Sequence, residues 1–325
     1  MKNLFLYIIC LILGGAGAWL ISRWGKALGL LDKPNERSSH KGLVPKGGGI
    51  GILAAFVVSS LLLNIPPSFW FPITAIALFS FCGDRIEFSP KLRLSLQFIA
   101  AIIFLFGINT AIQSRMSGLL LILAMAVFIV GTANFYNFMD GINGIAAITG
   151  IVGFGLLALY SFLSESYSSF AVLSVCIYFS CLGFLSFNIP KARVFMGDVG
   201  SILLGFTFAV MVVRLSKNLL DFICLAAFLF PFYADELTTM VVRITDGENL
   251  LRAHHRHLYQ LLANEKGVSQ WNVSVGYGLL QLVVGVTVLL LKPFGGIMIL
   301  PILMAFFVGF TMVSYFIRKN LTTLV

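Results

Sequence analysis

The sequence predicts an all-α, polytopic integral membrane protein with ten or eleven transmembrane helices. Of its 325 residues, 59% are hydrophobic and only 11% carry a charge, a composition that excludes an ordinary soluble domain. Apolar runs of the length that a bilayer requires, roughly 17–25 residues, recur along the whole chain. We interpret residues 1–325 as a single transmembrane domain.

The predicted spans follow one another with polar loops between them. The third run is short and the ninth is interrupted by Pro231, so the count is ten or eleven. The first run follows one charge, Lys2, and has no small-residue cleavage site, which favours a retained helix over a signal peptide. The spans are 4–22, 48–64, 69–82, 94–110, 117–136, 145–163, 168–187, 199–214, 218–242, 272–291 and 294–316.

Positive charge is distributed unevenly between alternate loops. Seventeen of the 22 Lys and Arg residues fall in loops 23–47, 83–93, 188–198 and 243–271 and in the C-terminal tail. Cytoplasmic loops of membrane proteins carry such an excess. We therefore predict a periplasmic N-terminus, a cytoplasmic C-terminus and eleven spans, with these loops in the cytoplasm.

The polar segment 188–201 is the first candidate site. Asp198 follows Gly197 at the start of a hydrophobic run. Glycine lets a ligand approach the backbone closely, and a new helix offers free N–H groups to an anion. This pattern favours a metal or phosphate site. The alternative is that Asp198 only caps a helix that starts at Val199.

Two earlier loops carry charge. Loop 23–47 has six cations, His40 and a run of glycines before a helix, which suits an anionic ligand or, alternatively, an anchor at the lipid headgroups. In loop 83–93, Asp84 and Glu87 are three residues apart, so both can face one direction in a helical turn. The alternative for Asp84 is a surface ion pair with a nearby cation.

The loop after the fifth span contains no Lys or Arg. Asn134, Asn137, Asp140 and Asn143 recur there at intervals of three residues, so they lie along one face of a helical turn. Short polar side chains beside hydrocarbon are costly unless they bind something. Helix capping alone explains only part of this group.

The ninth run ends in a further polar region. Asp235 and Glu236 lie inside the run, and acids in such a position mark a functional site or an interior pair. His255 and His257 follow, but their spacing does not place both on one helical face, which weakens a zinc interpretation. With Arg256 between them, this cluster favours binding of an oxyanion.

All of these polar sites are predicted to share the cytoplasmic side. A transporter would place ionisable residues near the bilayer midplane, often in two related halves. Here acids suited to a cation and bases suited to phosphates gather at one membrane face. Because Mg²⁺ is usually held by one or two carboxylates together with substrate phosphates, the pattern predicts phosphoryl transfer to or from a lipid.

The sequence resembles the polyprenyl-phosphate N-acetylhexosamine-1-phosphate transferases, which include the enzymes that initiate O-antigen, enterobacterial common antigen and peptidoglycan precursors. The resemblance covers loop one to about residue 260. It rests on Asp32-x-Pro34, Arg37-x-x-His40 with Pro45-x-Gly-Gly48, Asn137-Phe-Met-Asp-Gly-Ile-Asn-Gly144, Phe195-Met-Gly-Asp-Val-Gly-Ser201 and the histidine stretch. The histidine stretch is most similar to that of the O-antigen initiators.

The resemblance implies a function and a set of site residues. The reaction would join UDP-N-acetylhexosamine and undecaprenyl phosphate, releasing UMP, at the inner (cytoplasmic) membrane of a bacterium, with Mg²⁺ or Mn²⁺ as cofactor and no nucleic-acid partner. The donor, GlcNAc or a 6-deoxy sugar, the pathway, and the choice between monomer and homodimer stay open. The implied residues are Asp84, Asp140 and Asp198 as catalytic acids, Asp198 and Asn137 as metal ligands, Phe195 as a uracil-stacking ring, Asn143 and Asn188 in the nucleotide pocket, and His255, Arg256 and His257 around the diphosphate and sugar.

One position departs from the family pattern. The family usually has two consecutive aspartates in loop two, and here Gly83 precedes Asp84. In some proposals the missing acid deprotonates the lipid phosphate, but a phosphate monoester with a second pKa near ~6 is already largely dianionic at neutral pH. Two alternatives therefore stand beside the transferase: a transporter or flippase of an anionic lipid or sugar phosphate, and a catalytically impaired homologue that binds its ligand.

Overall fold

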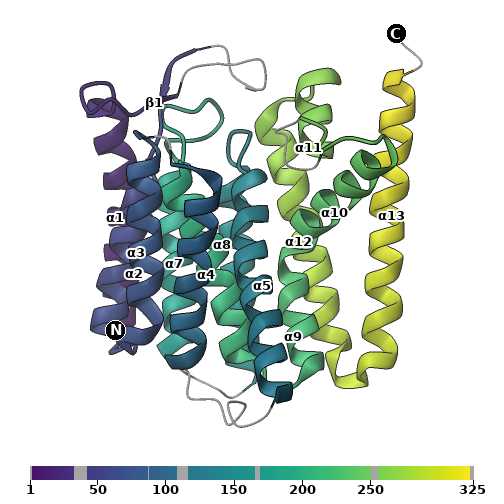
Figure 1. Ribbon diagram of the computed structural model, residues 1–325. Helices are drawn as coiled ribbons and strands as arrows, with labels where there is room; N and C mark the ends of the chain where they lie inside the picture. The colour runs from purple at the N-terminus through teal and green to yellow at the C-terminus, as the bar shows by residue number, and fades with distance from the viewer. Residues whose placement is uncertain are drawn as a thin grey trace.

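The computed structural model describes residues 2–32, 42–86, 88–107, 116–164, 169–249 and 255–322. Long helices form one bundle, and their ends lie at two opposite levels, with the N-terminus near one level and the C-terminus beyond the other (Figure 1). The predicted all-α membrane fold is confirmed. Seven described helices are long and apolar enough to cross a membrane: α1 (Lys2–Trp24), α4 (Pro90–Gly107), α5 (Met116–Phe138), α6 (Ile145–Leu163), α8 (Asp198–Leu215), α12 (Gln270–Leu291) and α13 (Gly296–Thr322).

Three further apolar helices are shorter, and they match the predicted second, third and seventh spans. These are α2 (Ile50–Leu62), α3 (Pro67–Gly83) and α7 (Ser169–Leu185). The ninth run is broken, as its proline indicated: α9 (Leu219–Ala226) and a 3₁₀ turn (Ala227–Leu229) lead into α10 (Phe230–Thr245). Pro231 lies in the first turn of α10, where its missing N–H costs no helical hydrogen bond. Helix α10 runs obliquely to the bundle (Figure 1).

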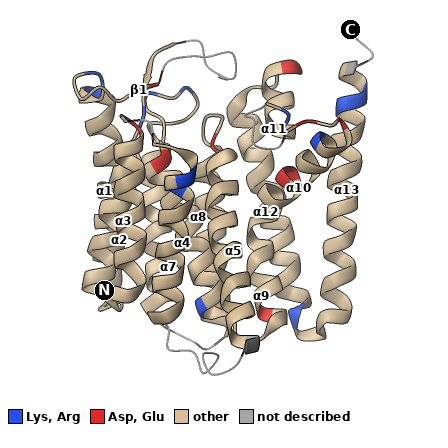
Figure 2. Cartoon of the chain, in the orientation of Figure 1, with Lys and Arg blue, Asp and Glu red and all other residues tan. Residues whose placement is uncertain are grey.

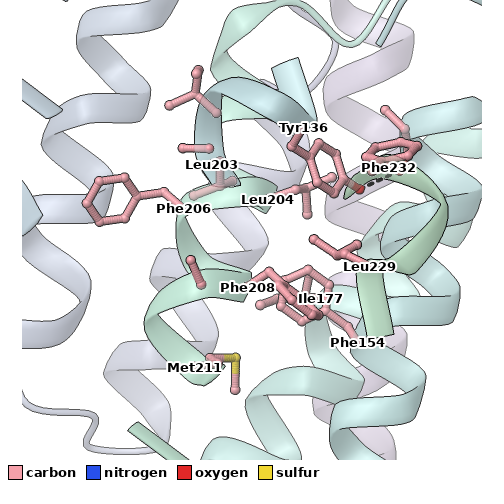
Figure 3. Close-up of a cluster of buried hydrophobic side chains, with 14 of the residues drawn as sticks. Tyr136, Phe154, Ile177, Leu203, Leu204, Phe206, Phe208, Met211, Leu229 and Phe232 are labelled. Atoms are coloured by element: carbon pink, nitrogen blue, oxygen red, sulfur yellow. Dashed lines mark hydrogen bonds between the residues drawn. The ribbon is translucent and has the colours of Figure 1, made fainter. Parts of the chain in front are cut away.

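Helix α8 is the centre of the hydrophobic core, with 14 of its 18 residues buried. Figure 3 shows Leu204 and Phe208 of α8 beside Tyr136 of α5 and Phe154 of α6. The Tyr136 hydroxyl donates a 2.6 Å hydrogen bond to the carbonyl of Ala146, so its polar atom is satisfied in the core. Close packing of this kind holds helices together in a bilayer, where apolar burial alone gives no preference for protein over lipid. The first residues of α8 are therefore held by a rigid element.

One end of the bundle carries the short irregular elements. Strands β1 (Leu31–Asp32) and β2 (Val44–Pro45) pair antiparallel there, and α11 (Leu258–Gln260) continues into a π-helical turn (Leu261–Glu265). Figure 2 shows most charged residues at this end and only a few at the other. The predicted gathering of polar loops at one level is thus confirmed, while its assignment to the cytoplasm stays a prediction.

That assignment has a direct test. Reporter fusions after residues 191 and 262 are expected to report the cytoplasm, and a fusion after residue 217 the periplasm, because loops with excess Lys and Arg stay inside. Complementary alkaline phosphatase and green fluorescent protein fusions would measure this. A periplasmic signal at residue 191 or 262 would contradict the orientation.

Candidate active site

Two glycine-containing segments meet at the start of α8. The N–H of Gly48 donates to the carbonyl of Phe195 at 2.9 Å, and the N–H of Gly49 donates to that of Met196 at 2.9 Å. A Cβ added to Gly49 would lie 2.4 Å from the Cα of Gly200, a distance that forbids any side chain there. Glycine is thus required for the backbones to approach, and the contact fixes the N-terminus of α8.

Asp84, just after α3, caps this helix. Its carboxylate accepts hydrogen bonds from the backbone N–H groups of Asp198, at 3.4 Å, and Val199. The Nζ of Lys46 lies 3.8 Å from the same carboxylate. Asp84 is buried, and its Oδ2 has no hydrogen-bond partner among the described residues. The capping function proposed as an alternative for Asp198 therefore belongs to Asp84 and leaves the Asp198 side chain available.

The Asp198 carboxylate faces polar partners from two other helices. Arg93, in the first turn of α4, forms an ion pair with its Oδ2. Asn137, in the last turn of α5, donates its amide to Oδ1 at 2.9 Å and to the hydroxyl of Ser201 at 2.8 Å. The Asp198 side chain is 29% exposed, so a ligand can reach it. Asp198 and Asn137, the two implied metal ligands, thus contact each other, and the Arg93 guanidinium balances the charge of the carboxylate. Metal binding by this pair stays a prediction.

Asp140 belongs to the same electrostatic group. Burial of its carboxyl and the charges of Asp198 and Asp84 raise the pKa of Asp140 from 3.8 to about 7. Burial and the charge of Asp198 likewise raise the pKa of Asp84 to about 7, although Lys46 opposes the shift. The pKa values of both carboxyls are thus raised chiefly by burial, and the neighbouring negative charges add to the effect. Perturbed pKa values of this kind are common at functional sites.

These residues fit a divalent cation in one particular way. Within the described part of the chain, no three His, Cys, Asp or Glu side chains lie close enough to hold an ion by themselves. Mg²⁺ typically uses one or two protein carboxylates and completes its shell with water and substrate phosphates. The hydrogen-bond-free Oδ2 of Asp84 and the accessible carboxylate of Asp198 meet that smaller requirement.

The two asparagines predicted for the nucleotide pocket join neighbouring loops. Asn188 is buried; its Oδ1 accepts the N–H of Gly144 at 2.6 Å, and its Nδ2 donates to the carbonyl of Val194 at 2.9 Å. The Nδ2 of Asn143 donates to the carbonyl of Pro190 at 3.3 Å. Both amides thus hold loop 139–144 against loop 188–194. Direct contact of either amide with a nucleotide stays a prediction.

The ring of Phe195 is half-buried at the junction of the two glycine-containing segments. Its backbone N–H donates to the carbonyl of Pro45 at 2.8 Å, which places the residue beside Lys46 and near the start of α8. Stacking of this ring on uracil stays a prediction.

The histidine and arginine cluster, which is predicted to bind an oxyanion, lies beside several acidic side chains. His257 is buried, with its Nε2 3.4 Å from Glu236 Oε2 and its Nδ1 3.7 Å from Asp235 Oδ1. Arg256 forms ion pairs with Asp246, at 2.6 Å, and with Glu248. His255 is half-buried. Binding of a diphosphate by these three residues stays a prediction, and for Arg256 it requires exchange of its acidic partners.

Sequence reasoning missed the structural function of Asp235. Its carboxylate accepts the N–H of Leu258 at 2.8 Å and the hydroxyl of Tyr277 at 2.7 Å. Tyr259, which follows Leu258, donates its hydroxyl to the carbonyl of Phe138 at 3.1 Å, and this bond links the segment to the end of α5. Sequence reasoning also missed the ion pair between Arg93 and Asp198. Position 93 gave no signal beyond its positive charge in loop two.

Comparison with known proteins finds similarity over the segments that form this site. The profile of glycosyl transferase family 4 matches residues 66–216, the stretch that contains Asp84, Asp140 and Asp198. The matched stretch is somewhat less than half of the chain, and over this stretch the chain is similar to the family. The predicted resemblance to polyprenyl-phosphate N-acetylhexosamine-1-phosphate transferases is thereby confirmed.

Similarity to curated proteins extends beyond residue 216. An undecaprenyl-phosphate alpha-N-acetylglucosaminyl 1-phosphate transferase of Thermotoga maritima is 27% identical over 252 residues, which covers 76% of this chain and 78% of the relative. A protein of the same name from Haemophilus influenzae is 35% identical over 198 residues, 55% of this chain and 56% of the relative. A phospho-N-acetylmuramoyl-pentapeptide-transferase of Halalkalibacterium halodurans is 24% identical over 275 residues, 75% and 82% of the two chains.

Proposed function

We propose that this chain transfers N-acetylhexosamine 1-phosphate from a UDP-N-acetylhexosamine to undecaprenyl phosphate and releases UMP. The observation that carries the proposal is the gathering of Asp84, Asp140 and Asp198 with Arg93 and Lys46 at the N-terminus of the central helix. Acids there suit a divalent cation, and bases suit phosphates. The relatives from Thermotoga maritima and Haemophilus influenzae are named as undecaprenyl-phosphate transferases, and the bacterial inner membrane is the location that such a lipid requires.

The proposed reaction is one phosphoryl transfer. A phosphate oxygen of the lipid attacks the β-phosphorus of the nucleotide sugar and forms a new P–O bond. The bond between that phosphorus and the bridging oxygen breaks, and UMP leaves with the oxygen and its electron pair. Such transfers depend chiefly on positioning and charge stabilisation. Here the rigid helix ends would position the substrates, and Arg93 and Lys46 would stabilise their negative charge.

Mg²⁺, or Mn²⁺, is the proposed cofactor, and when bound it would neutralise charge on the diphosphate and on departing UMP. Asp198 and Asn137 would hold it, with Asp84 beside them. In that state the Arg93 guanidinium, now paired with Asp198, would be free to bind a substrate phosphate. Whether the enzyme works as a monomer or a homodimer is open in this proposal.

The test uses purified full-length protein with undecaprenyl phosphate and a panel of UDP-N-acetylhexosamines, including GlcNAc and 6-deoxy donors. We expect lipid-linked sugar phosphate and UMP in equal amounts, and exchange of labelled UMP into the donor. Uptake or flipping of a lipid without UMP release would favour the transporter alternative. Donor binding without either product would favour the impaired homologue.

Position 83 provides a prediction about the mechanism. A Cβ on Gly83 would lie 3.5 Å from the ring of Phe88, an ordinary contact, so Gly83→Asp is expected to fold. If the lipid phosphate attacks as a dianion, the added acid places negative charge beside an incoming anion, and the initial rate should stay unchanged or fall up to about tenfold. Gly83→Asn is the uncharged control. A large rate gain in Gly83→Asp from a nearly inactive parent would contradict this mechanism.

The acidic group also predicts a pH dependence of cation binding. Because the pKa values of Asp84 and Asp140 are raised to about 7, both carboxyls bind protons below that pH and compete with a cation. Each carboxyl that must lose its proton before Mg²⁺ binds should lower the affinity for Mg²⁺ roughly tenfold per pH unit below pH 7. Mg²⁺-dependent thermal stabilisation at pH 6 and pH 8, without substrates, measures this.

The same shifts fix the sign of the pH effect on stability without Mg²⁺. Between pH 3.8 and about 7 the folded protein retains protons that the unfolded chain has lost, so its stability should decline as pH rises through this window. Equal Mg²⁺ stabilisation at pH 6 and pH 8 would show that protonation of Asp84 and Asp140 does not compete with the ion.

A further inference from the structure

The end of the bundle opposite the candidate active site contains an apolar groove of about 480 Å³. Helix α8 connects the two places, with Asp198 at its first turn and Arg214 at its last. The walls of the groove come from α4, α5, α8 and α9, and include Leu105, Met125 and Phe222. Its volume is within the range of small-molecule and lipid sites in proteins.

Two cations lie at the rim of this groove. Arg214 and Lys217 both line it, and both are exposed. The Arg214 guanidinium lies 5.4 Å from the ring centroid of Phe170, a cation–π contact that brings no compensating negative charge. Within the described ranges, no carboxylate forms an ion pair with either cation.

Asp221, in the first turn of α9, is a described acid at this end of the bundle, and its carboxylate already has other partners. Its Oδ1 lies 2.7 Å from the Nζ of Lys292, and its Oδ2 accepts the backbone N–H of Lys217 at 3.1 Å. Among the described residues, the positive charges of Arg214 and Lys217 therefore have no carboxylate partner. This is the end with few cations, where the positive-inside rule gives no reason for them.

We propose that this groove binds an anionic phospholipid. The headgroup phosphate would lie between Arg214 and Lys217, and an acyl chain would lie along the apolar walls. Basic pockets between transmembrane helices bind lipid phosphates in this way, since each cation near the membrane surface adds to the affinity. A long cationic side chain that only extends to water does not require an apolar groove beside it, so the combination of groove and cations favours a lipid. This inference is independent of the proposed function.

The experiment is a lipid titration of purified full-length protein, read by native mass spectrometry. Phosphatidylglycerol is expected to bind roughly 10- to 30-fold more tightly than phosphatidylcholine with the same chains, given two uncompensated cations. The double variant Arg214→Gln, Lys217→Gln should lose this preference. The matched control, Arg23→Gln with Lys26→Gln, neutralises one exposed Arg and one exposed Lys at the other end and should keep it.

Further arms separate lipid from free phosphate and guard against misfolding. Soluble glycerol phosphate, which has the charge but no chains, should not compete at equal concentration. Lys217→Gln alone changes one exposed residue and should weaken phosphatidylglycerol several-fold if the double variant does not fold. Equal binding of both lipids, an undiminished preference in the variants, or full competition by glycerol phosphate would each overturn the proposal.

Discussion

Asp198→Asn is expected to reduce the proposed transfer on the order of 100- to 1,000-fold or more while the protein stays folded. The substitution keeps the size of the side chain and its contact with Asn137, but removes the charge that pairs with Arg93 and would hold a cation. Because this ion pair is partly exposed, its loss should cost about 1 kcal/mol or less of stability. The helix start is unaffected, since Asp84 caps it.

Initial rates and thermal unfolding of wild type and variant, with and without Mg²⁺, measure this. Glu265→Gln, which neutralises an exposed acid at the same end of the bundle, is the matched control and should leave both rate and stability unchanged. Mg²⁺-dependent stabilisation should disappear only in Asp198→Asn. Near-normal turnover in that variant would remove Asp198 from the catalytic site and with it the principal support for the proposed metal.

The helices were predictable because hydrocarbon length sets a strong constraint on sequence. Each apolar run became a helix, and Pro231 marked the break between α9 and α10. The charge distribution likewise placed the loops of Asp84 and Asp198 at one end, and the alternation of the spans placed the loop of Asp140 there as well. The oblique path of α10 was beyond prediction, since it depends on packing against α12 and α13 and not on local propensity.

Within the site, residue identity was easier to predict than residue function. The spacing around Asn137 and Asp198 indicated a polar cluster, and the two side chains do contact each other. Which acid caps α8 could not be predicted, because Asp84 is 114 residues away in sequence from Asp198. The partner of Arg93 is similarly remote. Long-range pairing of this kind leaves no periodic signal in one sequence.

The side-chain pairing of the histidine segment could not be predicted from composition either. Interleaved His and Arg residues predicted an oxyanion receptor, and that function stays a prediction. Nearby acids determine the pairing: His257 turns inward to Asp235 and Glu236, and Arg256 pairs with loop acids. Charges of opposite sign in neighbouring segments need to be paired in three dimensions before a receptor can be inferred.

Asp235→Ala is expected to lower the free energy of unfolding by about 3–5 kcal/mol, because a buried charge network loses its central acceptor. The carboxylate accepts hydrogen bonds from the backbone N–H groups of Leu258 and Tyr259 and from the hydroxyl of Tyr277. Its removal also leaves His257 with Glu236 as its acidic neighbour. Thermal unfolding should shift down by roughly 5–10 °C, and protease cleavage between residues 246 and 270 should become faster.

Glu236→Gln is the matched control for this prediction. The carboxylate of Glu236 is also buried, but its Oε2 lies near His257 without a hydrogen bond among the described residues, so its neutralisation should cost far less stability. Differential scanning fluorimetry and limited proteolysis of both variants measure the difference. If Asp235→Ala unfolds at the wild-type temperature yet has lost transfer activity, the acid acts in the chemistry, as acids inside an apolar run suggest, and its structural function is secondary. The expected result is the reverse: lost stability in Asp235→Ala, and in Glu236→Gln a protein that stays folded.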